Sequence, residues 1–398
     1  MSLKRKIIFV FLLLFLFGIG FSGGYFFGKT RVICEVCPPK DINFSLFWEA
    51  WKVLQEKFAD KEKFDVQKMI YGAISGMVKS LEDPYTTFFN PEDTKRFIED
   101  VKGTFEGVGM EIGQRKGQLQ VIAPLENTPA QKAGLRAGDK IIKINDTLTA
   151  DLTLDEAINL IRGPKDTQVT LTIFREEWEK TKEFKIVREV IEVPSLKWEL
   201  RPINGYPDIA YLKLYQFSEK ASFDFRVAAI EILNSQAKKI ILDLRNNPGG
   251  YLEVAQDIAG WFLKRGEIVA IEDLGEGKEQ NLYKAQGNSA LAEVPIVILI
   301  NQGSASGSEI LAGALRDNRG ILLIGEKSFG KGSVQELERL SEGSSLKITI
   351  AKWLTPKGES ITDRGLEPDI KVEMTEEDYE EDRDPQLDKA LEIIQTLK

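Results

Sequence analysis

Three short segments hold residues that could carry out chemistry together. They are a serine-rich turn at Asn301–Glu309, a glycine-rich turn at Gly325–Gln335 and a turn with paired glycines at Asp243–Gly250. In the first, Ser306 stands at the start of a predicted helix, where free amides and the helix dipole favour developing negative charge. In the second, Lys331 stands between two glycines, so other backbone can approach it closely and shield its amine from water. Such a hydroxyl and such an amine could act as nucleophile and base.

The absence of histidine limits the mechanisms that this pair could use. It excludes Ser–His–Asp and Cys–His hydrolysis and zinc sites built on imidazole. The base of any hydrolase here must therefore be a lysine, a carboxylate or a metal-bound water. The net charge of −9 also argues against nucleic acid as a partner, because phosphate binding needs clustered Lys and Arg.

A lysine acts as a base near neutral pH only if its pKa is strongly lowered. The pKa must fall by roughly 3 units from about 10.4, which costs on the order of 4 kcal/mol, and burial can produce a shift of that size. Gln335, four residues after Lys331, would lie one turn further along and hold the amine in line.

Each of the three segments also has an ordinary structural explanation. Ser306 with Glu309 reads as a capping box at a helix start. Lys331 in a glycine-rich turn could be a solvated surface residue, and Asp243–Gly250 could be a generic turn. Taken one at a time, the segments leave both explanations open.

Strands and helices alternate from about residue 190 to residue 372. This alternation predicts βαβ units and a mostly parallel sheet covered on both faces, with the chemistry where strands lead into helices. The expected strands are Ile209–Tyr215, Lys239–Leu244, Pro295–Ile300 and Ile321–Ile324. The expected helices are Phe223–Leu233, Tyr251–Leu263, Glu309–Leu315 and, after an acidic run, Pro385–Leu397.

From Gly103 to about Val190 the pattern changes to short strands and turns. Apolar residues at 169, 171 and 173 alternate with polar ones and predict a half-buried strand. Leu154–Ile161 predicts a short amphipathic helix. With T-P-A-Q-K-A-G-L (128–135) and A-G-D-K-I-I-K-I-N (137–145), this order resembles a PDZ domain.

The PDZ resemblance implies a peptide-binding groove. In PDZ domains a loop of the form apolar–Gly–apolar offers backbone N–H groups to the C-terminal carboxylate of a peptide, which adds as a strand to the sheet edge. Val108, Gly109 and Met110 match that loop. Arg162, after the helix that should line the groove, is a charge partner for the carboxylate by this interpretation.

The N-terminal part predicts a membrane anchor and a helical segment. An uncharged run over residues 7–28 follows Lys4, Arg5 and Lys6, is long enough to cross a bilayer, and would leave the rest of the chain outside the cytoplasm. A cleaved signal peptide is the alternative. Apolar residues at helical spacing from 44 to 54 and from 69 to 81 predict helices with one buried face.

The two cysteines lie in the linker that follows this run. Cys34 and Cys37 stand as C-E-V-C before two prolines. Outside the cytoplasm, such a pair favours a local disulfide or a bond between protomers.

Taken together, the three turns resemble the carboxyl-terminal processing (tail-specific) proteases. These carry S-A-S-A-S-E at the nucleophile, a lysine 25 residues later in F-G-K-G, and a glutamine four further on; here Lys331 is 25 residues after Ser306 and Gln335 is 4 further. Matching segments at 83–91 (D-P-Y-T-T-F-F-N-P) and 354–361 (L-T-P-K-G-E-S-I) extend the resemblance over nearly the whole chain past the anchor. The resemblance implies that Ser306 is the nucleophile, Lys331 the general base and Gln335 its orienting partner.

The resemblance also implies an oxyanion hole and a substrate class, and with it we expect no cofactor and no metal ion. The oxyanion would be bound by the backbone N–H of Gly307 together with that of Gly249 or Gly250. The substrates would be protein tails, cleaved near their C-termini while the PDZ domain binds the terminus and gates the site. The sequence departs from the family in one place, because Gly307 replaces the usual alanine after the nucleophile.

The fold class is therefore a multidomain α+β/α/β chain. We expect a protease core of βαβ units, a possible homodimer or higher oligomer, and a single-pass membrane protein with extracytoplasmic catalytic domains. The expected parts are an anchor (1–30), a linker (31–40), a helical domain (41–102), a PDZ domain (103–189), the Ser–Lys core (190–374) and an acidic segment with a C-terminal helix (375–398).

Two other functions fit parts of the sequence. The run from Gly325 to Lys331 comes close to a nucleotide-binding phosphate loop, although Gly332 stands where a hydroxyl should bind Mg²⁺. A catalytically inactive scaffold that binds peptides through its PDZ domain alone is the second alternative.

Overall fold

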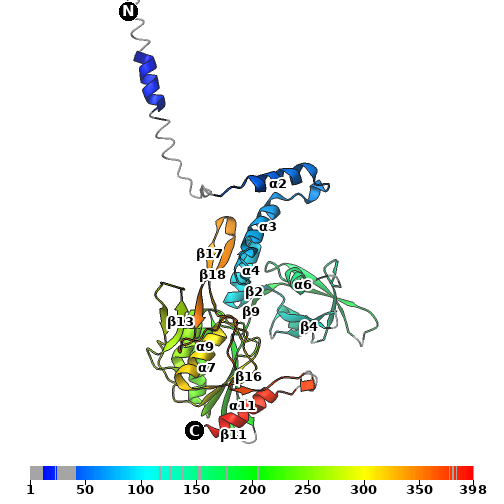
Figure 1. The fold of residues 1–398 in the computed structure, drawn as a ribbon. Coiled ribbons are helices and arrows are strands. Elements are labelled where there is room, and N and C mark those ends of the chain that lie inside the picture. Colours follow the sequence, from blue (N-terminus) through cyan, green and yellow to red (C-terminus); the bar gives the residue numbers. More distant parts are fainter. Residues whose placement is uncertain are drawn as a thin grey trace, which may run out of the picture. The chain divides into compact units, whose positions relative to one another are not determined.

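The computed structural model describes most of the chain (Figure 1). The described residues are 12–22, 24, 42–115, 118–125, 127–136, 138–150, 152, 154–175, 178–203, 206–375, 377–378, 381 and 383–397. The chain divides into two compact units, residues 1–70 and residues 71–398.

The predicted membrane anchor over residues 7–28 is described only in part. Residues 12–22 and 24 are helical. Within the described ranges, no helix is both long enough and apolar enough to cross a membrane. Cys34 and Cys37, for which we expected a disulfide, lie outside the described residues.

The apolar face predicted for residues 44–54 forms but is not buried. Helix α2 (Ser45–Lys57) has no buried residue, and Trp48 is 60% exposed. Its aromatic side chains pack against one another, with the rings of Phe47 and Trp48 5.1 Å apart. The buried face was predicted wrongly because periodicity shows that an apolar surface exists and does not show what covers it. Two helices follow: η1 (Lys61–Lys63) and α3 (Val66–Lys79).

A strand interrupts the region that was predicted to be helical up to residue 101. β1 (Thr87–Phe89) pairs antiparallel with β18 (Ser345–Leu354). α4 (Pro91–Lys102) follows and is capped at both ends. The side chain of Asn90 accepts bonds from two N–H groups of the first turn, and Gly103 closes the other end with φ 76°. These are ordinary helix caps.

An antiparallel sheet with two short helices follows, with the strand order β3-β4-β5-β7-β8 and β6 beside β5. The side chains at 169, 171 and 173 are fully buried, as their alternation predicted, and α6 has the predicted bounds. The two-stranded pair of β2 and β9 flanks this sheet in the sequence. The elements are β2 (Thr104–Gly107), β3 (Met110–Arg115), β4 (Gln118–Pro124), α5 (Pro129–Lys132), β5 (Lys140–Ile144), β6 (Thr147–Leu148), α6 (Leu154–Ile161), β7 (Gln168–Phe174), β8 (Lys182–Val187) and β9 (Glu189–Glu192).

The central sheet of the core has the order β10-β11-β12-β15-β16-β19. Only β10 and β11 are antiparallel; all other neighbours are parallel. Parallel strands are buried on both faces and read as continuous apolar runs, and all five residues of β15 are buried. The strands are β10 (Leu196–Ile203), β11 (Tyr206–Leu214), β12 (Lys239–Asp243), β15 (Ile296–Ile300), β16 (Leu322–Gly325) and β19 (Ile370–Lys371).

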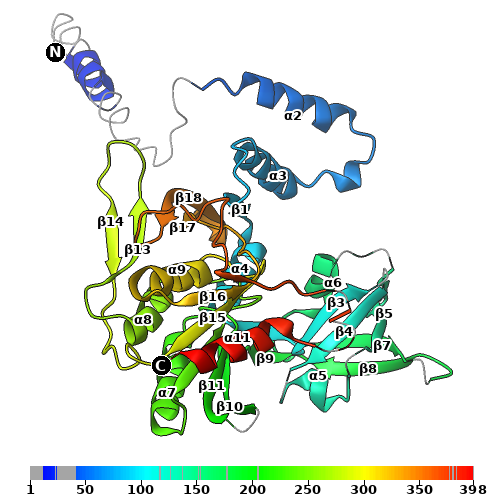
Figure 2. The same cartoon turned by 60° about the horizontal axis from the view of Figure 1, so that its bottom comes forward.

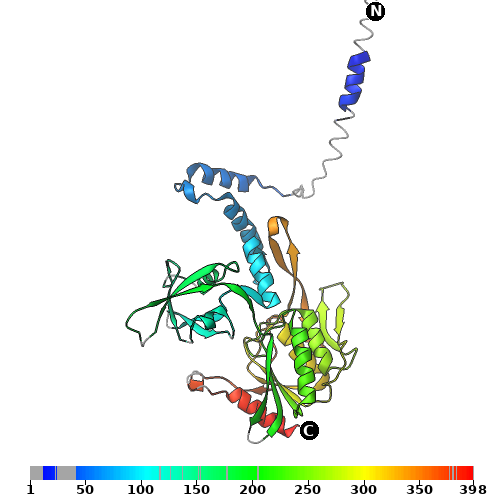
Figure 3. The ribbon, with the colours of Figure 1, turned by 180° about the vertical axis from the view of Figure 1, so that it is seen from behind.

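Helices cover both faces of this sheet. Leu242 and Ile298 face one apolar cluster, formed with α7, α8 and α9. Ile241 and Val297 face the other, formed with α11. Figure 2 shows α11 across the strands, and Figure 3 shows α7 and α8 from behind. The helices are α7 (Ala221–Asn234), α8 (Leu252–Phe262), α9 (Gly307–Arg319) and α11 (Pro385–Thr396).

A second sheet lies beside the helical layer, with the order β1-β18-β13-β14, and β17 pairs with β18. It packs Trp353 of β18 against Tyr283 of β14, with the rings 5.4 Å apart. The remaining elements are β13 (Ile268–Asp273), β14 (Asn281–Lys284), β17 (Ser333–Arg339) and η2 (Ser341–Gly343).

Candidate active site

The three turns singled out in the sequence follow three neighbouring parallel strands. β12, β15 and β16 are adjacent in the central sheet, so their carboxyl ends open at one edge, where α/β folds keep their sites. The turns at Asp243–Gly250, Asn301–Glu309 and Gly325–Gln335 leave these ends.

Ser306 stands at the mouth of α9 in an unusual backbone conformation. Its φ of 52° with ψ of −112° is a region that residues with side chains rarely occupy. Its side chain is half-buried and lines a cavity. Of the two bonds of the expected capping box, the one from the Ser306 N–H to Glu309 Oε2 is 2.9 Å.

The loop after β12 supports the Ser306 turn from below. The Asn247 carbonyl accepts bonds from the Ala305 N–H (3.0 Å) and the Ser308 hydroxyl (2.9 Å). The side-chain amide of Asn247, which is fully buried, donates to the Leu214 carbonyl at 2.8 Å. These buried hydrogen bonds fix the loop and the start of α9 relative to each other.

Hydrogen bonding distinguishes the N–H groups of Gly249 and Gly250, the two candidates for the second oxyanion donor. The Gly249 N–H donates to Asn247 Oδ1 at 2.9 Å and is therefore occupied. Among the described residues, neither the Gly250 N–H nor the Gly307 N–H has an acceptor. The two are close, because a methyl group placed on Gly307 would lie 3.5 Å from the Gly250 nitrogen. The free pair is Gly250 with Gly307.

Close packing explains the glycines at these positions. At Gly249, with φ 95°, a Cβ would lie 2.7 Å from the Gly307 nitrogen and 2.8 Å from the Ser306 Cβ. At Gly307 a methyl group would lie 3.2 Å from the ring of Phe217, which is fully buried. The alanine that is usual in the family would therefore be in tight contact with Phe217.

Lys331 lines the same cavity as Ser306. Its side chain is half-buried, and burial lowers the pKa of its amine, although the charge of Glu309 opposes the shift. The flanking glycine Gly332 packs against backbone, since a Cβ there would lie 2.3 Å from the Thr362 nitrogen. The amine also lies 5.8 Å from the centre of the Tyr85 ring.

Glu309 joins the serine turn to the lysine turn. Its carboxylate, 1% exposed, accepts from the Ser306 N–H (2.9 Å) and the Lys331 N–H (3.0 Å) through Oε2. Oε1 accepts from the Gly330 N–H (2.7 Å) and the Ser328 hydroxyl (2.6 Å). Burial raises the pKa of Glu309 while these donors oppose the shift. The sequence marked this residue only as a helix cap, and its second role depends on contacts 19 to 22 residues away.

Gln335 has a different partner from the one expected. It lies in strand β17 and not one helical turn after Lys331. Its side-chain amide donates to the Tyr85 carbonyl at 2.9 Å. Gln335 still lines the cavity with Lys331, and its bond ties the 83–91 segment to the site. The strand after the lysine turn also removes the phosphate-loop alternative, because that motif leads into a helix.

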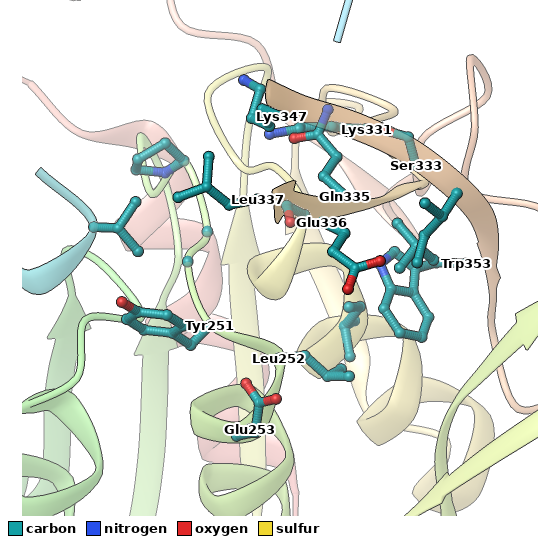
Figure 4. Close-up of a pocket in the computed structure, with 18 of the residues that line it drawn as sticks. Tyr251, Leu252, Glu253, Lys331, Ser333, Gln335, Glu336, Leu337, Lys347 and Trp353 are labelled. Atoms are coloured by element: carbon teal, nitrogen blue, oxygen red, sulfur yellow. The ribbon is translucent and has the colours of Figure 1, made fainter. Parts of the chain in front are cut away.

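The cavity has a volume of about 680 Å³ and walls of mixed character. Figure 4 shows Lys331, Gln335 and Lys347 together at one end, with Leu252 and Trp353 on the walls and Glu253 at the opposite end. The sequence analysis did not single out two residues near this site. Lys347 lines the cavity, and the ring of Tyr85 lies beside the Lys331 amine.

The predicted peptide groove is a second cavity. It is lined by Val108, Gly109, Met110 and Arg162. Arg162 Nη1 donates to Asp100 Oδ1 at 2.7 Å, so the guanidinium has a carboxylate partner within the chain.

Comparisons with known proteins agree with this architecture. Residues 208–372 match peptidase family S41, residues 120–175 match the PDZ domain, and residues 39–93 match the N-terminal domain of the activating protease CtpB.

Relatives with names of the same kind span most of the chain. A carboxy-terminal-processing protease of Bartonella bacilliformis is 42% identical over 78% of this chain and 70% of its own length. The carboxy-terminal processing protease CtpA of Bacillus subtilis is 36% identical over 84% of this chain and 70% of its own. A CtpA-like serine protease of Staphylococcus epidermidis is 36% identical over 81% of this chain, which spans 64% of that relative.

A solved structure shares the fold as well. The photosystem II D1 C-terminal processing protease is 28% identical, with a TM-score of 0.52 over 82% of this chain and 92% of its own. The identity and coverage of these relatives show that the chain belongs to the carboxy-terminal processing proteases of peptidase family S41, which are serine-type peptidases with a PDZ domain.

Proposed function

We propose that Ser306 and Lys331 perform the peptidase reaction as a catalytic dyad. Neutral Lys331 Nζ takes the proton of the Ser306 hydroxyl while Oγ forms a bond to the carbonyl carbon of the substrate. The C–N bond then breaks, the lysine returns the proton to the leaving amine, and an acyl-enzyme remains. Water, deprotonated by the same lysine, hydrolyses the ester and restores the hydroxyl.

The observation that carries the proposal is the joint position of the two groups. Ser306 and Lys331 line one cavity, and Glu309 bonds to the backbone of both turns. Burial lowers the pKa of Lys331, as a base with a proton to gain requires. Gln335, through Tyr85, supports the wall beside the amine.

The N–H groups of Gly307 and Gly250 form the proposed oxyanion hole. Both are free of acceptors among the described residues and lie next to the serine. Losing one such donor typically costs about 10²–10³ in rate. Gly249 has a supporting role, because its own N–H is bonded to Asn247.

The dyad is tested by Ser306→Ala with a serine-directed acylating probe. Hydrolysis of a protein with an apolar C-terminal tail should fall by about 10⁴-fold or more. The probe should add its mass to Ser306 alone in the unaltered protein. Hydrolysis that persists in the alanine variant, or a label on another residue, would contradict the assignment.

The substrates that we propose are protein tails cleaved near their C-termini. The groove of Val108, Gly109, Met110 and Arg162 would bind the terminus by strand addition. A groove that positions the tail would also gate the catalytic cavity. Amidation of the tail carboxylate should weaken binding to this groove, which peptide titration of the Ser306→Ala variant measures.

We also propose that residues 7–28 anchor the chain in a membrane, with the catalytic domains outside the cytoplasm. The basic residues before an uncharged run support this orientation. Alkaline extraction of membranes should leave the anchored protein in the pellet.

The exposed apolar face of α2, with Trp48 60% exposed, supports a homodimer or higher oligomer. Sedimentation of Trp48→Glu beside the unaltered protein tests it, and identical masses would reject this contact.

A further inference from the structure

A second lysine in the catalytic cavity has no part in the proposed reaction. Lys347 lines the cavity with Ser306. It lies in β18 directly opposite Leu337 of β17, two positions along from the pair formed by Gln335 and Thr349. Diagonal neighbours in an antiparallel pair are about 7–8 Å apart. Lys347 is therefore about two residue lengths of an extended peptide from Gln335.

The surroundings of Lys347 leave its charge without a partner of opposite sign. Its Nζ lies 5.5 Å from the ring centre of Phe89 and 5.4 Å from that of Phe97. The two rings stack with centres 5.0 Å apart and form an aromatic surface beneath the ammonium group. No carboxylate in the described part of the chain forms an ion pair with Lys347. Asp83, whose charge acts on it from further away, accepts bonds from Thr86 and Tyr85 instead.

This environment is costly for a cation. Burial lowers the pKa of Lys347, the charge on Lys331 lowers it further, and Asp83 opposes both. A half-buried charge that is unpaired in the free protein gains most from a ligand of opposite charge. An arriving carboxylate would both complete the ion pair and rest beside the aromatic surface.

The charged residues of the cavity favour one position for a carboxylate ligand. Glu253, Glu272 and Glu336 also line the cavity, and Figure 4 shows Glu253 at the end opposite Lys347. An anionic group would be repelled there and attracted to the Lys347 end. The proposed reaction does not use the Lys347 amine, and a carboxylate bound beside it would favour its charged form.

We propose that Lys347 is a specificity residue that binds a carboxylate of the substrate close to the scissile bond. The carboxylate is either the α-carboxylate that ends a short tail or the side chain of an Asp or Glu. This inference rests on the proposed function, because it places the substrate across Ser306.

The test compares matched peptides on the full chain. One pair differs only in a C-terminal carboxylate or amide, with the terminus within three residues of the cleaved bond. The second pair has free termini and differs only in Glu or Gln beside that bond. We expect kcat/KM to favour the carboxylate in at least one pair by about tenfold, the strength of one charge-assisted bond.

The variants separate carboxylate binding from other roles of Lys347. Lys347→Gln should bring the Glu–Gln preference close to one and reduce the carboxylate–amide preference to what the PDZ groove alone supplies. Lys347→Arg should keep most of both preferences. A change in the pKa of Lys331 affects both peptides of a pair alike, and the preference of the PDZ groove for a carboxylate is the same in both proteins. Both effects therefore cancel when the preference of the unaltered protein is divided by that of Lys347→Gln. Lys352→Gln is the matched control, because Lys352 is exposed on the same strand and does not line the cavity.

The two pairs identify the source of the carboxylate. If Lys347→Gln reduces the preference only in the carboxylate–amide pair, Lys347 binds the α-carboxylate. If it reduces the preference only in the Glu–Gln pair, Lys347 binds the acidic side chain. Equal preferences in the unaltered protein and in Lys347→Gln, for both pairs, overturn the proposal.

A binding measurement keeps this result separate from the proposed function. The same peptides are titrated into Ser306→Ala and into Ser306→Ala with Lys347→Gln, and the ratios of Kd are compared. If no peptide is hydrolysed by the unaltered protein, the dyad fails, while a ratio that depends on Lys347 still supports the carboxylate site. A ratio independent of Lys347 overturns it.

Discussion

At the residue scale, Lys331 combines a chemical advantage with a cost in stability. Burial favours the neutral form of an amine, which can act as a base. In the unfolded chain the same amine is solvated and binds its proton more tightly. Because the pKa of Lys331 is lowered in the folded state, folding at neutral pH must release that proton or retain it in an unfavourable place. Function and stability therefore oppose each other at this one side chain.

Lys331→Met should abolish hydrolysis and raise the free energy of unfolding. Between the lowered folded pKa and the ordinary value of 10.5, the unfolded chain binds more protons than the folded one, so the unaltered protein gains stability as pH rises. The advantage of the Lys331→Met variant should be complete below the folded pKa and vanish as pH approaches 10.5. Denaturant unfolding at several pH values measures it.

Lys327→Met is the control for this prediction. Lys327 lies in the same turn, but its side chain is 50% exposed and pairs with Glu367. Removing this exposed side chain should not reproduce the gain in stability of Lys331→Met. A Lys331→Met variant that is equally or less stable at every pH would mean that the lysine is not desolvated.

At the element scale, Glu309 holds a helix start and a loop in one arrangement. Its two oxygens accept four hydrogen bonds and donate none of them. A carboxylate can accept all four, whereas the NH₂ group of an amide can accept none. In Glu309→Gln, the NH₂ group must face two of these donors. We expect a loss of about 2–4 kcal/mol in the free energy of unfolding and a fall in kcat of about 10²-fold, since small displacements of reacting groups have effects of that order.

Ser328→Ala serves as the comparison for the Glu309 variant. It removes one of the four donors and leaves the bonds to Ser306 and Lys331 in place. Because the Ser328 hydroxyl also accepts from the Leu366 N–H at 2.6 Å, its removal should cost about 1–3 kcal/mol, with kcat nearly unchanged. If Glu309→Gln retains full kcat, the carboxylate does not position the dyad.

Elements with a strong local pattern could be predicted from the sequence. The helix at Leu154–Ile161 has the predicted bounds, and the strands that feed the three turns lie within a few residues of their expected positions. The serine and lysine turns were recognisable because their glycines and spacing are local features. Their meeting in one cavity follows from the adjacency of parallel strands, which the alternating pattern implies.

Elements that depend on distant partners could not be predicted in this way. Thr87–Phe89 becomes a strand only by pairing with β18, more than 250 residues further along the chain. Gln335 was placed by the spacing of a helix, whereas pairing with Thr349 makes it part of a strand. No local sequence pattern shows that Glu309 connects two turns or that Lys347 lines the cavity. Both roles depend on which loops the sheet brings together.

At the scale of the whole molecule, the peptide groove and the catalytic cavity are connected through α4. Arg162 of the groove pairs with the Asp100 side chain and lies 4.5 Å from the centre of the Phe105 ring. The Asp100 carbonyl accepts a bond from the Gln216 side chain at 2.8 Å, and Gln216 lines the catalytic cavity. A peptide carboxylate that draws Arg162 away from Asp100 would therefore act on a residue that touches the cavity wall.

Asp100→Asn should strengthen peptide binding to the groove with little effect on stability. The pair is partly exposed, with side chains 24% and 51% accessible, and such pairs contribute about 0–1 kcal/mol. Freeing Arg162 should lower the Kd of a C-terminal peptide about two- to fivefold, as measured by titration in the Ser306→Ala background. Glu99→Gln, one residue away and paired with Lys95 alone within the described ranges, should leave the Kd unchanged. The increase in affinity must disappear when Arg162→Gln is added. If it persists, Asp100 does not compete with the peptide carboxylate for Arg162.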